Sequence, residues 1–174
     1  ISVRVVFGHS GSILAACRQA RVDIGFSHHP YDHPEYLCQL VDEDEVVLVT
    51  GGRNRALRGG VPHARIKDLP FLSSNFLYAS THSWLFPRNQ QFQLEVDVAR
   101  HALPFLKTGN WVTLLPRKMV REELDAGTLL EIPIVDGAIP PVRTHRVVRR
   151  DGVAQGAVRA WLSFSEGLGL PADS

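Results

Sequence analysis

The sequence predicts an α/β fold with two lobes, and three features carry this prediction. Residues 106–130 read as the end of a helix, a short apolar strand at 111–115, a second helix and a second strand. Residues 2–26 repeat the order strand, helix, strand. Two extended segments, near Asp44 and near Asp136, join these sets. Strands that alternate with helices favour a mostly parallel sheet with helices packed on it.

Three residues set the boundaries within residues 106–130. Gly109 fits the position just past a helix, where a positive φ angle is cheap only for glycine. Pro116 fits the first turn of the next helix, because that position has no N–H bond to lose. Gly127 is expected to end this helix. The segment therefore predicts a βαβ unit with its helix on one face of a parallel sheet.

The beginning of the chain predicts a second unit of this kind. Residues 2–7 (SVRVVF) have the β-branched content of a strand. Ser10 is expected to cap a helix that runs to about Arg21, and residues 22–26 form the next strand. Cys17 is expected to pack on that helix as a small apolar group.

The remaining elements follow from pattern and turn residues. Asp97 is expected to cap a helix up to Thr108, and Pro104 should kink that helix or shift its start. An acidic break at 42–44 separates two strands. Further strands are predicted at 37–41, 46–49, 71–74, 92–96 and 142–148, and helices around Trp84 and at 153–168.

Composition restricts the class of protein. The 174 residues are 44% hydrophobic and 21% charged, the balance of a globular protein, and the net charge is +1. There is no run of about 18 apolar residues, so no membrane partner is expected. The start does not resemble a signal peptide. Two cysteines make a poor disulfide framework, so reduced thiols and a cytoplasmic location are expected.

Four motifs in order resemble the effector-binding domain of LysR-type transcriptional regulators over nearly the whole chain. They lie at 20–26 (ARVDIGF), 40–49 (LVDEDEVVLV), 106–116 (LKTGNWVTLLP) and 123–129 (ELDAGTL). The sequence departs from the family pattern at three positions. Trp111 replaces the second glycine of the third motif, Ala20 stands where glycine is usual, and Pro104 is unexpected.

The resemblance implies a type 2 periplasmic-binding-protein-like fold, in which each lobe is a mostly parallel sheet flanked by helices and two strands cross between the lobes. Residues 1–44 with 137–174 correspond to lobe I, and residues 45–136 to lobe II. The first strand and helix of the family's lobe I have no counterpart here, nor has the winged helix-turn-helix that binds DNA. The chain is therefore expected to be a fragment of a longer protein.

The family binds small effectors, often carboxylates or other anions, between its lobes. Helix starts with free N–H groups and hydroxyl side chains suit such ligands. For each candidate an ordinary structural role stays open: a helix cap for Ser10, a solvated loop for His28, and core packing for Trp111. The expected effector-binding residues are His9, Ser10, Gly11, His28, Ser80, Thr81, His82, Trp111 and Thr113.

The first hypothesis is thus a ligand sensor, the effector-binding part of a LysR-type regulator, with no catalytic residues, cofactor or metal. It would self-associate as a dimer or tetramer and reach promoter DNA only through a domain outside this chain. The alternatives are a solute-binding receptor of a transport system with the same fold and, more remotely, an enzyme on that fold.

Other features favour ordinary roles over special ones. The spacing of His28, His29 and His33 is compatible with a metal, but no compact ligand set completes it. Cys17 and Cys38 are a remote candidate for a redox switch. The basic segment 53–60 (RNRALRGG) reads as a solvated turn, with phosphate binding as the alternative.

Overall fold

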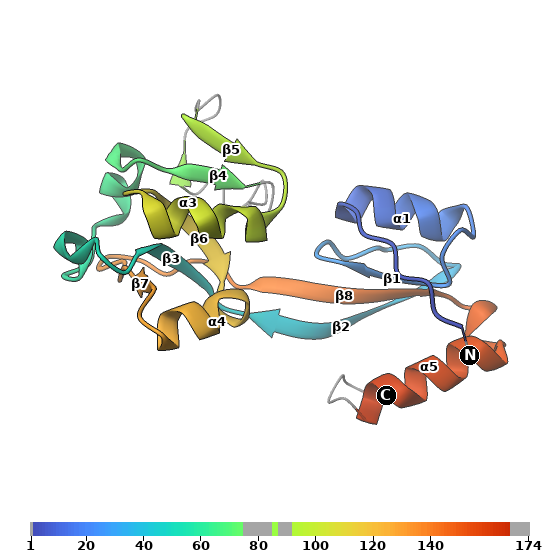
Figure 1. The fold of residues 1–174 in the computed structure, drawn as a ribbon. Helices are drawn as coiled ribbons and strands as arrows, with labels where there is room; N and C mark the ends of the chain where they lie inside the picture. Colours follow the sequence, from blue (N-terminus) through green and yellow to red (C-terminus); the bar gives the residue numbers. More distant parts are fainter. Residues whose placement is uncertain (1, 75–84, 87–91, 168–174) are drawn as a thin grey trace. The chain divides into compact units, whose positions relative to one another are not determined.

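The computed structural model describes residues 2–74, 85–86 and 92–167, and the chain divides into two compact units. Unit 1 comprises residues 1–43 and 142–174, and unit 2 comprises residues 44–141. Each unit is a mixed α/β body with sheets flanked by helices (Figure 1). The expectation for the helix around Trp84 falls outside the described residues.

Unit 1 is built on a three-stranded sheet in the order β1-β8-β2. Its strands are β1 (Ile24–Ser27), β2 (Tyr36–Asp44) and β8 (Val142–Arg149). β1 and β8 run antiparallel, so Ile24 faces Val148 and Ser27 faces His145. Its helices are α1 (Ser10–Arg18), the 3-10 turn η4 (Gly152–Ala154) and α5 (Gly156–Gly167).

Successive residues of β8 hold the two helices on opposite faces of this sheet. Val147 is fully buried in a cluster with Cys17 of α1, whereas Val148 is buried in a cluster with Val158 and Leu162 of α5. Side chains along a strand alternate between the faces of a sheet, so Val147 packs against α1 and Val148 packs against α5. The expected packing of Cys17 as a small apolar group is confirmed, because only 4% of its surface is exposed.

The predicted strand at residues 2–7 is wrong. These residues have no regular secondary structure, and Phe7 is 92% exposed. A strand needs a neighbour to accept its backbone hydrogen bonds, and no described strand pairs with this segment. The segment instead borders a cavity of about 500 Å³ that β1 and α5 also line.

Unit 2 contains a mixed sheet in which β3 (Val46–Gly51) lies between β6 (Val112–Pro116) and β7 (Leu129–Glu131). A second pair, β4 (Leu72–Ser74) and β5 (Leu94–Val96), is parallel, and a parallel bridge from Phe71 to Val112 links it to β6. The helical elements are η1 (Arg55–Leu57), η2 (His63–Asp68), η3 (Ala99–Ala102), α3 (Leu103–Thr108) and α4 (Arg117–Asp125).

The predicted βαβ unit is correct in strand direction but not in adjacency. β6 and β7 are both antiparallel to β3, so they run parallel to each other with β3 between them. β4, β5, β6 and β7 therefore share one direction and only β3 opposes them. The pattern of residues 106–130 does not reveal that β3 lies between β6 and β7, because β3 comes from residues far upstream. The α/β fold class is confirmed.

Of the expected boundary residues, Pro104 and Gly127 behave as predicted, whereas the acidic residues 42–44, Asp97 and Gly109 do not. The acidic residues 42–44 end β2 rather than interrupt it. Pro104 lies in the first turn of α3, which confirms that it shifts the helix start, and Val98 rather than Asp97 precedes η3. Gly127 has the positive φ expected at a helix end, +67°. Gly109 does not: its φ is −125°, and it is needed because a Cβ there would lie 2.7 Å from the Trp111 ring.

One buried cluster holds unit 2 together. Val47 and Val49 of β3 pack with Leu106 of α3 and Val120 of α4, so both helices share a core with the central strand. All six residues of β3 are buried, as expected for the middle strand of a sheet. Among the described residues, no helix combines the length and the apolar character needed to cross a membrane.

A close backbone contact at the end of β3 is testable by substitution. A Cβ at Gly52 would overlap the carbonyl oxygen of Gly127, whereas a Cβ at Gly59 would meet nothing within 4 Å. We expect Gly52→Ala to lower the free energy of unfolding by about 2 kcal/mol or more, because backbone cannot move as a side-chain tip can. Gly59→Ala should change it by less than about 1 kcal/mol. Urea unfolding followed by tryptophan fluorescence measures both, and equal effects would contradict the geometry.

Candidate functional site

The start of α1 is an open helix end. His9 is the N-cap residue, with φ −70° and ψ 155°, and its side chain makes no capping hydrogen bond. Ser10 is the first helical residue, so the expectation that Ser10 caps the helix is wrong. The first turn contains no acidic residue, and a Cβ at Gly11 would meet nothing within 4 Å. Gly11 and Ser12 are exposed, so the start of α1 lies at the surface of unit 1.

Close packing of α1 on β1 brings this helix start to the end of the strand. A Cβ at Gly25 would lie 2.6 Å from Cys17 Sγ and 3.0 Å from Ile13 Cγ2. Only glycine allows the helix to approach β1 this closely. The backbone N–H of His28, the residue after β1, then donates a 3.1 Å hydrogen bond to Ser10 Oγ. The Ser10 hydroxyl is thus used to fix the loop to the helix start.

The His28 imidazole lies beside the beginning of β8. Its Nδ1 is 3.4 Å from the Arg143 carbonyl oxygen and 3.4 Å from Thr144 Oγ1. Burial lowers the pKa of His28 below its usual value; the bond to the Arg143 carbonyl partly opposes this, and the nearby His29 and His145 lower the pKa further. The lowered pKa favours the neutral imidazole at pH 7, which presents one donor and one acceptor nitrogen.

The residues around this junction are held in place by further bonds. Ser27 Oγ donates to the His29 carbonyl oxygen at 2.8 Å and accepts from the His29 N–H at 3.0 Å. Arg143 forms a 2.7 Å ion pair with Glu43 of β2. We name His9, Ser10, Gly11, His28 and Thr144 the unit 1 polar junction. It offers backbone N–H groups, hydroxyls and a neutral imidazole, which together can bind an anion or a carboxylate.

Sequence reasoning found four of these five residues and missed Thr144. Thr144 is next to His145, which pairs with Ser27 across the β1–β8 ladder. That pairing joins segments about 115 residues apart, and no local pattern reveals which strands become neighbours. The sequence predicted a strand at 142–148, but it did not predict which strand would pair with it or in which register.

In unit 2 the predicted site residues divide into two groups. Ser80, Thr81 and His82 lie outside the described residues. Thr113 is fully buried and its hydroxyl donates a 2.7 Å bond to the Leu72 carbonyl oxygen, so it offers no group to a ligand in this conformation. Trp111 is half-buried and packs against the core of unit 2, and its carbonyl oxygen accepts a 2.9 Å bond from Thr50 Oγ1.

Ser74, at the end of β4, was not anticipated. Its side chain is 2% exposed, and its hydroxyl has no hydrogen-bond partner among the described residues. A buried hydroxyl without a partner is costly, which makes such groups unusual in folded proteins. Ser74 lies at the carboxyl end of a parallel strand, the edge at which α/β sheets bind ligands.

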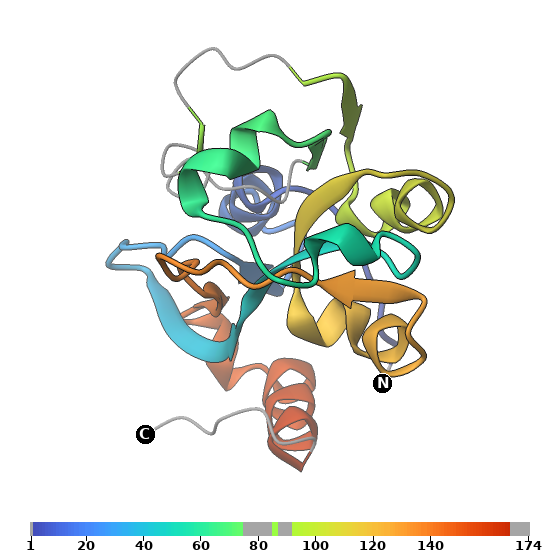
Figure 2. The same ribbon diagram turned by 90° about the vertical axis from the view of Figure 1, so that its left-hand side faces the viewer.

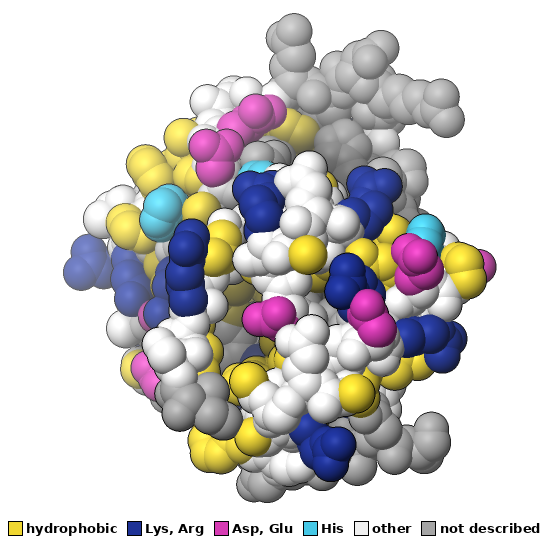
Figure 3. Space-filling view, turned by 90° about the vertical axis from the view of Figure 1, so that its right-hand side faces the viewer, with side chains coloured by type: hydrophobic (Ala, Val, Ile, Leu, Met, Phe, Trp, Pro, Cys, Tyr) yellow, Lys and Arg dark blue, Asp and Glu magenta, His cyan; other side chains and the backbone are white. Residues whose placement is uncertain are grey.

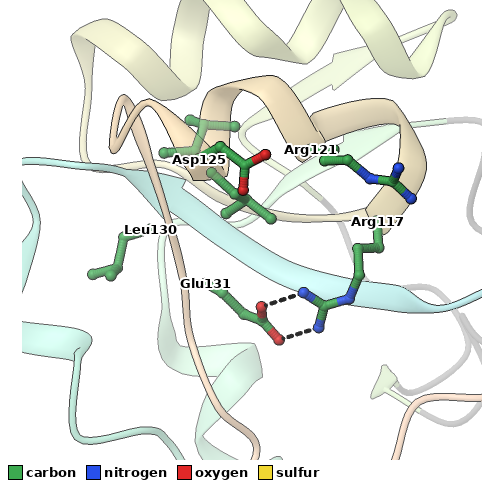
Figure 4. A pocket seen from close by; sticks show the side chains of 7 residues that line it. Arg117, Arg121, Asp125, Leu130 and Glu131 are labelled. Atoms are coloured by element: carbon green, nitrogen blue, oxygen red, sulfur yellow. Dashed lines mark hydrogen bonds and ion pairs between the residues drawn. The ribbon is translucent and has the colours of Figure 1, made fainter.

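A concave region of unit 2 has a volume of about 470 Å³ and is lined by residues of α4 and β7 (Figure 4). Arg117 is fully engaged there: it donates two bonds to Glu131, at 2.7 and 2.8 Å, and one to Glu45, at 2.6 Å. These carboxylates raise the pKa of Arg117. Figure 4 shows the Arg121 side chain directed away from Glu131. The Arg117 network engages three of the five guanidinium N–H groups with carboxylates of the protein itself, which indicates a structural role for this side chain.

The remaining candidates have structural roles. In the described part of the chain, no group of three or more His, Cys, Asp or Glu residues is arranged to hold a metal ion. His33 stacks on Tyr31, with ring centroids 5.6 Å apart. Cys17 and Cys38 are free thiols, and burial raises the pKa of Cys17, which makes its reactive thiolate scarcer.

Comparison with known proteins identifies a matching protein family and a similar bacterial protein. Residues 1–168 match the family described as LysR substrate binding domain. An HTH-type transcriptional regulator of Escherichia coli (strain K12), the uncharacterized YeiE, is 22% identical over 183 residues, which cover 98% of this chain. The chain spans 60% of that relative's length.

Two solved structures are similar in fold. The regulatory domain of CrgA, a LysR-type transcriptional regulator from Neisseria meningitidis, aligns with a TM-score of 0.68 and 12% identity, over 86% of this chain and 76% of that one. The reduced regulatory domain of OxyR2 from Vibrio vulnificus aligns with a TM-score of 0.66 and 17% identity, over 91% and 76%. At this level of identity the likeness establishes a shared fold.

The lowered pKa of His28 gives a prediction for stability against pH. The unfolded chain binds a proton near the ordinary histidine pKa, about 6.5, while the folded chain binds it only at lower pH. Protonation therefore favours unfolding, and stability should fall as the pH drops below about 6.5. His28→Gln should reduce this loss between pH 7.5 and 5.5, because glutamine does not titrate. Urea titrations across this range test it, and an unchanged pH slope in His28→Gln would contradict the assignment.

Proposed function

The chain belongs to the LysR substrate-binding domain family, and from this premise we propose that it senses a small anionic effector, which binds at the unit 1 polar junction. The observation that carries this proposal is the Ser10–His28 bond at an uncapped helix start. It aligns backbone N–H groups, two hydroxyls and a neutral imidazole in one unit.

An anion suits this junction for electrostatic reasons. The first N–H groups of an α-helix lack partners within the helix, and the helix dipole favours negative charge there. The first turn of α1 carries no acidic side chain to oppose an anion. A carboxylate would accept hydrogen bonds from the N–H groups of Gly11 and Ser12 and from the Ser10 and Thr144 hydroxyls, as in other anion sites at helix starts.

The second unit is proposed to supply the remaining contacts. The candidates are the sequence-predicted Ser80, Thr81, His82, Trp111 and Thr113, together with the buried hydroxyl of Ser74. Thr113 would act by positioning β4 through its bond to Leu72, since its own hydroxyl is occupied. An effector that contacts both units would favour one arrangement of them over others, and that bias is the signal.

We further propose that the signal acts on transcription, in a cytoplasmic protein that self-associates as a dimer or tetramer. Promoter DNA would be recognised by a domain outside this chain, as the helix-turn-helix in the name of the E. coli relative suggests. The family match favours this function over a solute-binding receptor of a transport system. We propose binding without catalysis, because the family is one of transcriptional regulators.

Ligand-dependent stability tests the proposal. A library of small carboxylates and inorganic anions should contain at least one compound that raises the melting temperature of the chain, because a ligand that binds only the folded state stabilises it. Ser10→Ala should weaken the affinity for that compound about three- to tenfold, the value of one hydrogen bond. Differential scanning fluorimetry with a ligand titration measures this.

Ser12→Ala is the matched control, because Ser12 lies on the same helix turn and is exposed. Its affinity should stay within a factor of two of the unmodified chain. If no anion raised the melting temperature, or if both serine variants bound equally well, the junction would not be the effector site.

A further inference from the structure

Three arginines project from one short turn that follows β3. Arg53, Arg55 and Arg58 are all exposed, and in the described part of the chain none of them is paired with a carboxylate. Other arginines are paired: Arg117 with Glu45 and Glu131, Arg143 with Glu43, and Arg149 with Asp151. We name residues 53–58 the arginine turn. It concentrates three unneutralised charges within six residues of a chain whose net charge is only +1.

The arginine turn is an ordered element. Asn54 Nδ2 donates to Thr50 Oγ1 at 3.2 Å, and the Asn54 N–H donates to the Gly51 carbonyl oxygen at 2.9 Å. At the other end of the turn, the Gly60 N–H donates to the Leu57 carbonyl oxygen at 3.0 Å. Gly60 has a φ of +83°, and a Cβ there would lie 2.8 Å from the Pro133 carbonyl oxygen. These bonds anchor the turn to the end of the buried strand β3.

The 3-10 geometry of η1 places the Cα–Cβ bonds of Arg55 and Arg58 on the same side of the turn. The Arg58 N–H donates to the Arg55 carbonyl oxygen at 3.2 Å, which completes the turn. Side chains three residues apart on a 3-10 helix eclipse each other and are separated by about 6 Å along the axis. Arg55 and Arg58 therefore leave the turn on the same side. Figure 2 shows η1 (teal) on the outer surface of unit 2, next to β7 (orange).

The chemistry of the turn fits phosphates better than a protein surface. Protein interfaces take most of their energy from aromatic and apolar anchors, and the residues between the arginines are Asn54, Ala56 and Leu57. Contacts to a nucleic-acid backbone need only cationic or polar groups at suitable spacing. The turn has the cations and lacks the apolar anchor.

A second copy of this chain is a poor partner for the turn. The acidic run at 42–45 is its strongest concentration of carboxylates, yet Glu43 is paired with Arg143 and Glu45 with Arg117. Asp44 accepts the Lys118 N–H at 3.1 Å and is buried. On the face in Figure 3, Lys and Arg side chains are spread out with Asp and Glu among them.

We infer that the arginine turn contacts the phosphate backbone of duplex DNA, independently of base sequence. This inference rests on the proposed function, because a transcriptional regulator works next to DNA. Each arginine neutralises one phosphate and releases its counterions. The contact would add to the affinity supplied by a separate DNA-binding domain and contribute nothing to choice of sequence.

The test is the salt dependence of binding of the 174-residue chain to a fluorescent 20-base-pair duplex of random sequence. With three phosphate contacts, the affinity measured by anisotropy should fall about 40-fold between 50 and 200 mM salt. The variant R53Q/R55Q/R58Q should lose at least tenfold in affinity at 50 mM salt and most of its salt dependence. R53K/R55K/R58K keeps the charge and should retain most of the binding.

The matched control is R18Q/R21Q/R159Q, which removes three exposed arginines of unit 1. It changes the net charge equally and should alter DNA affinity less than threefold. Equal losses in both glutamine triples would mean diffuse attraction and would overturn the inference, as would absence of DNA binding at 50 mM salt. The effector-induced rise in melting temperature should persist in R53Q/R55Q/R58Q, so failure of the DNA contact is distinguishable from failure of effector sensing.

Discussion

The hydrogen bond from the His28 N–H to Ser10 Oγ is the interaction on which the functional part of the structure depends. It connects the start of α1 to the end of β1 and exists because Gly25 lets the helix lie close to the strand. The Ser10 side chain is held in this way, the N-cap residue His9 makes no capping bond, and the first turn of α1 carries no acidic residue. The close packing at Gly25 therefore determines which groups surround the start of α1.

Unit 2 depends on a comparable connection at its own helix start. The buried Asp44 carboxylate accepts the Lys118 N–H, and the Glu45 carbonyl oxygen accepts the Arg117 N–H at 2.8 Å. An acidic group at the N-terminus of α4 satisfies free donors and complements the helix dipole. Here the anion that the helix start attracts is part of the protein. The start of α1 has no such group, and this difference makes it the better candidate for an external anion.

Local sequence patterns predicted the elements well where a segment's own residues determine its structure. Gly127 ends α4 with a positive φ, Pro104 shifts the start of α3, and β8 and α5 appear where the patterns placed them. The family motifs also indicated the α/β class, because their order reflects the whole chain. Four residues of the unit 1 polar junction followed from the same reasoning.

The main errors have a common physical origin in partners distant along the chain. Residues 2–7 have the composition of a strand but no described neighbour to pair with. Ser10 has the chemistry of a cap, yet its hydroxyl bonds to a residue 18 positions away. Thr144 joins the junction only through the β1–β8 pairing. Short-range patterns do not contain these relations.

The central claim is that an anionic effector binds at the open start of α1. Its most direct test is a titration of the isotopically labelled chain with a stabilising anion, followed by amide chemical shifts. The account predicts that the backbone amides of Gly11, Ser12 and His28 shift most among the residues of unit 1, in proportion to occupancy. Unchanged amides at these three residues, with shifts confined to the region of Arg117 and Arg121, would contradict it.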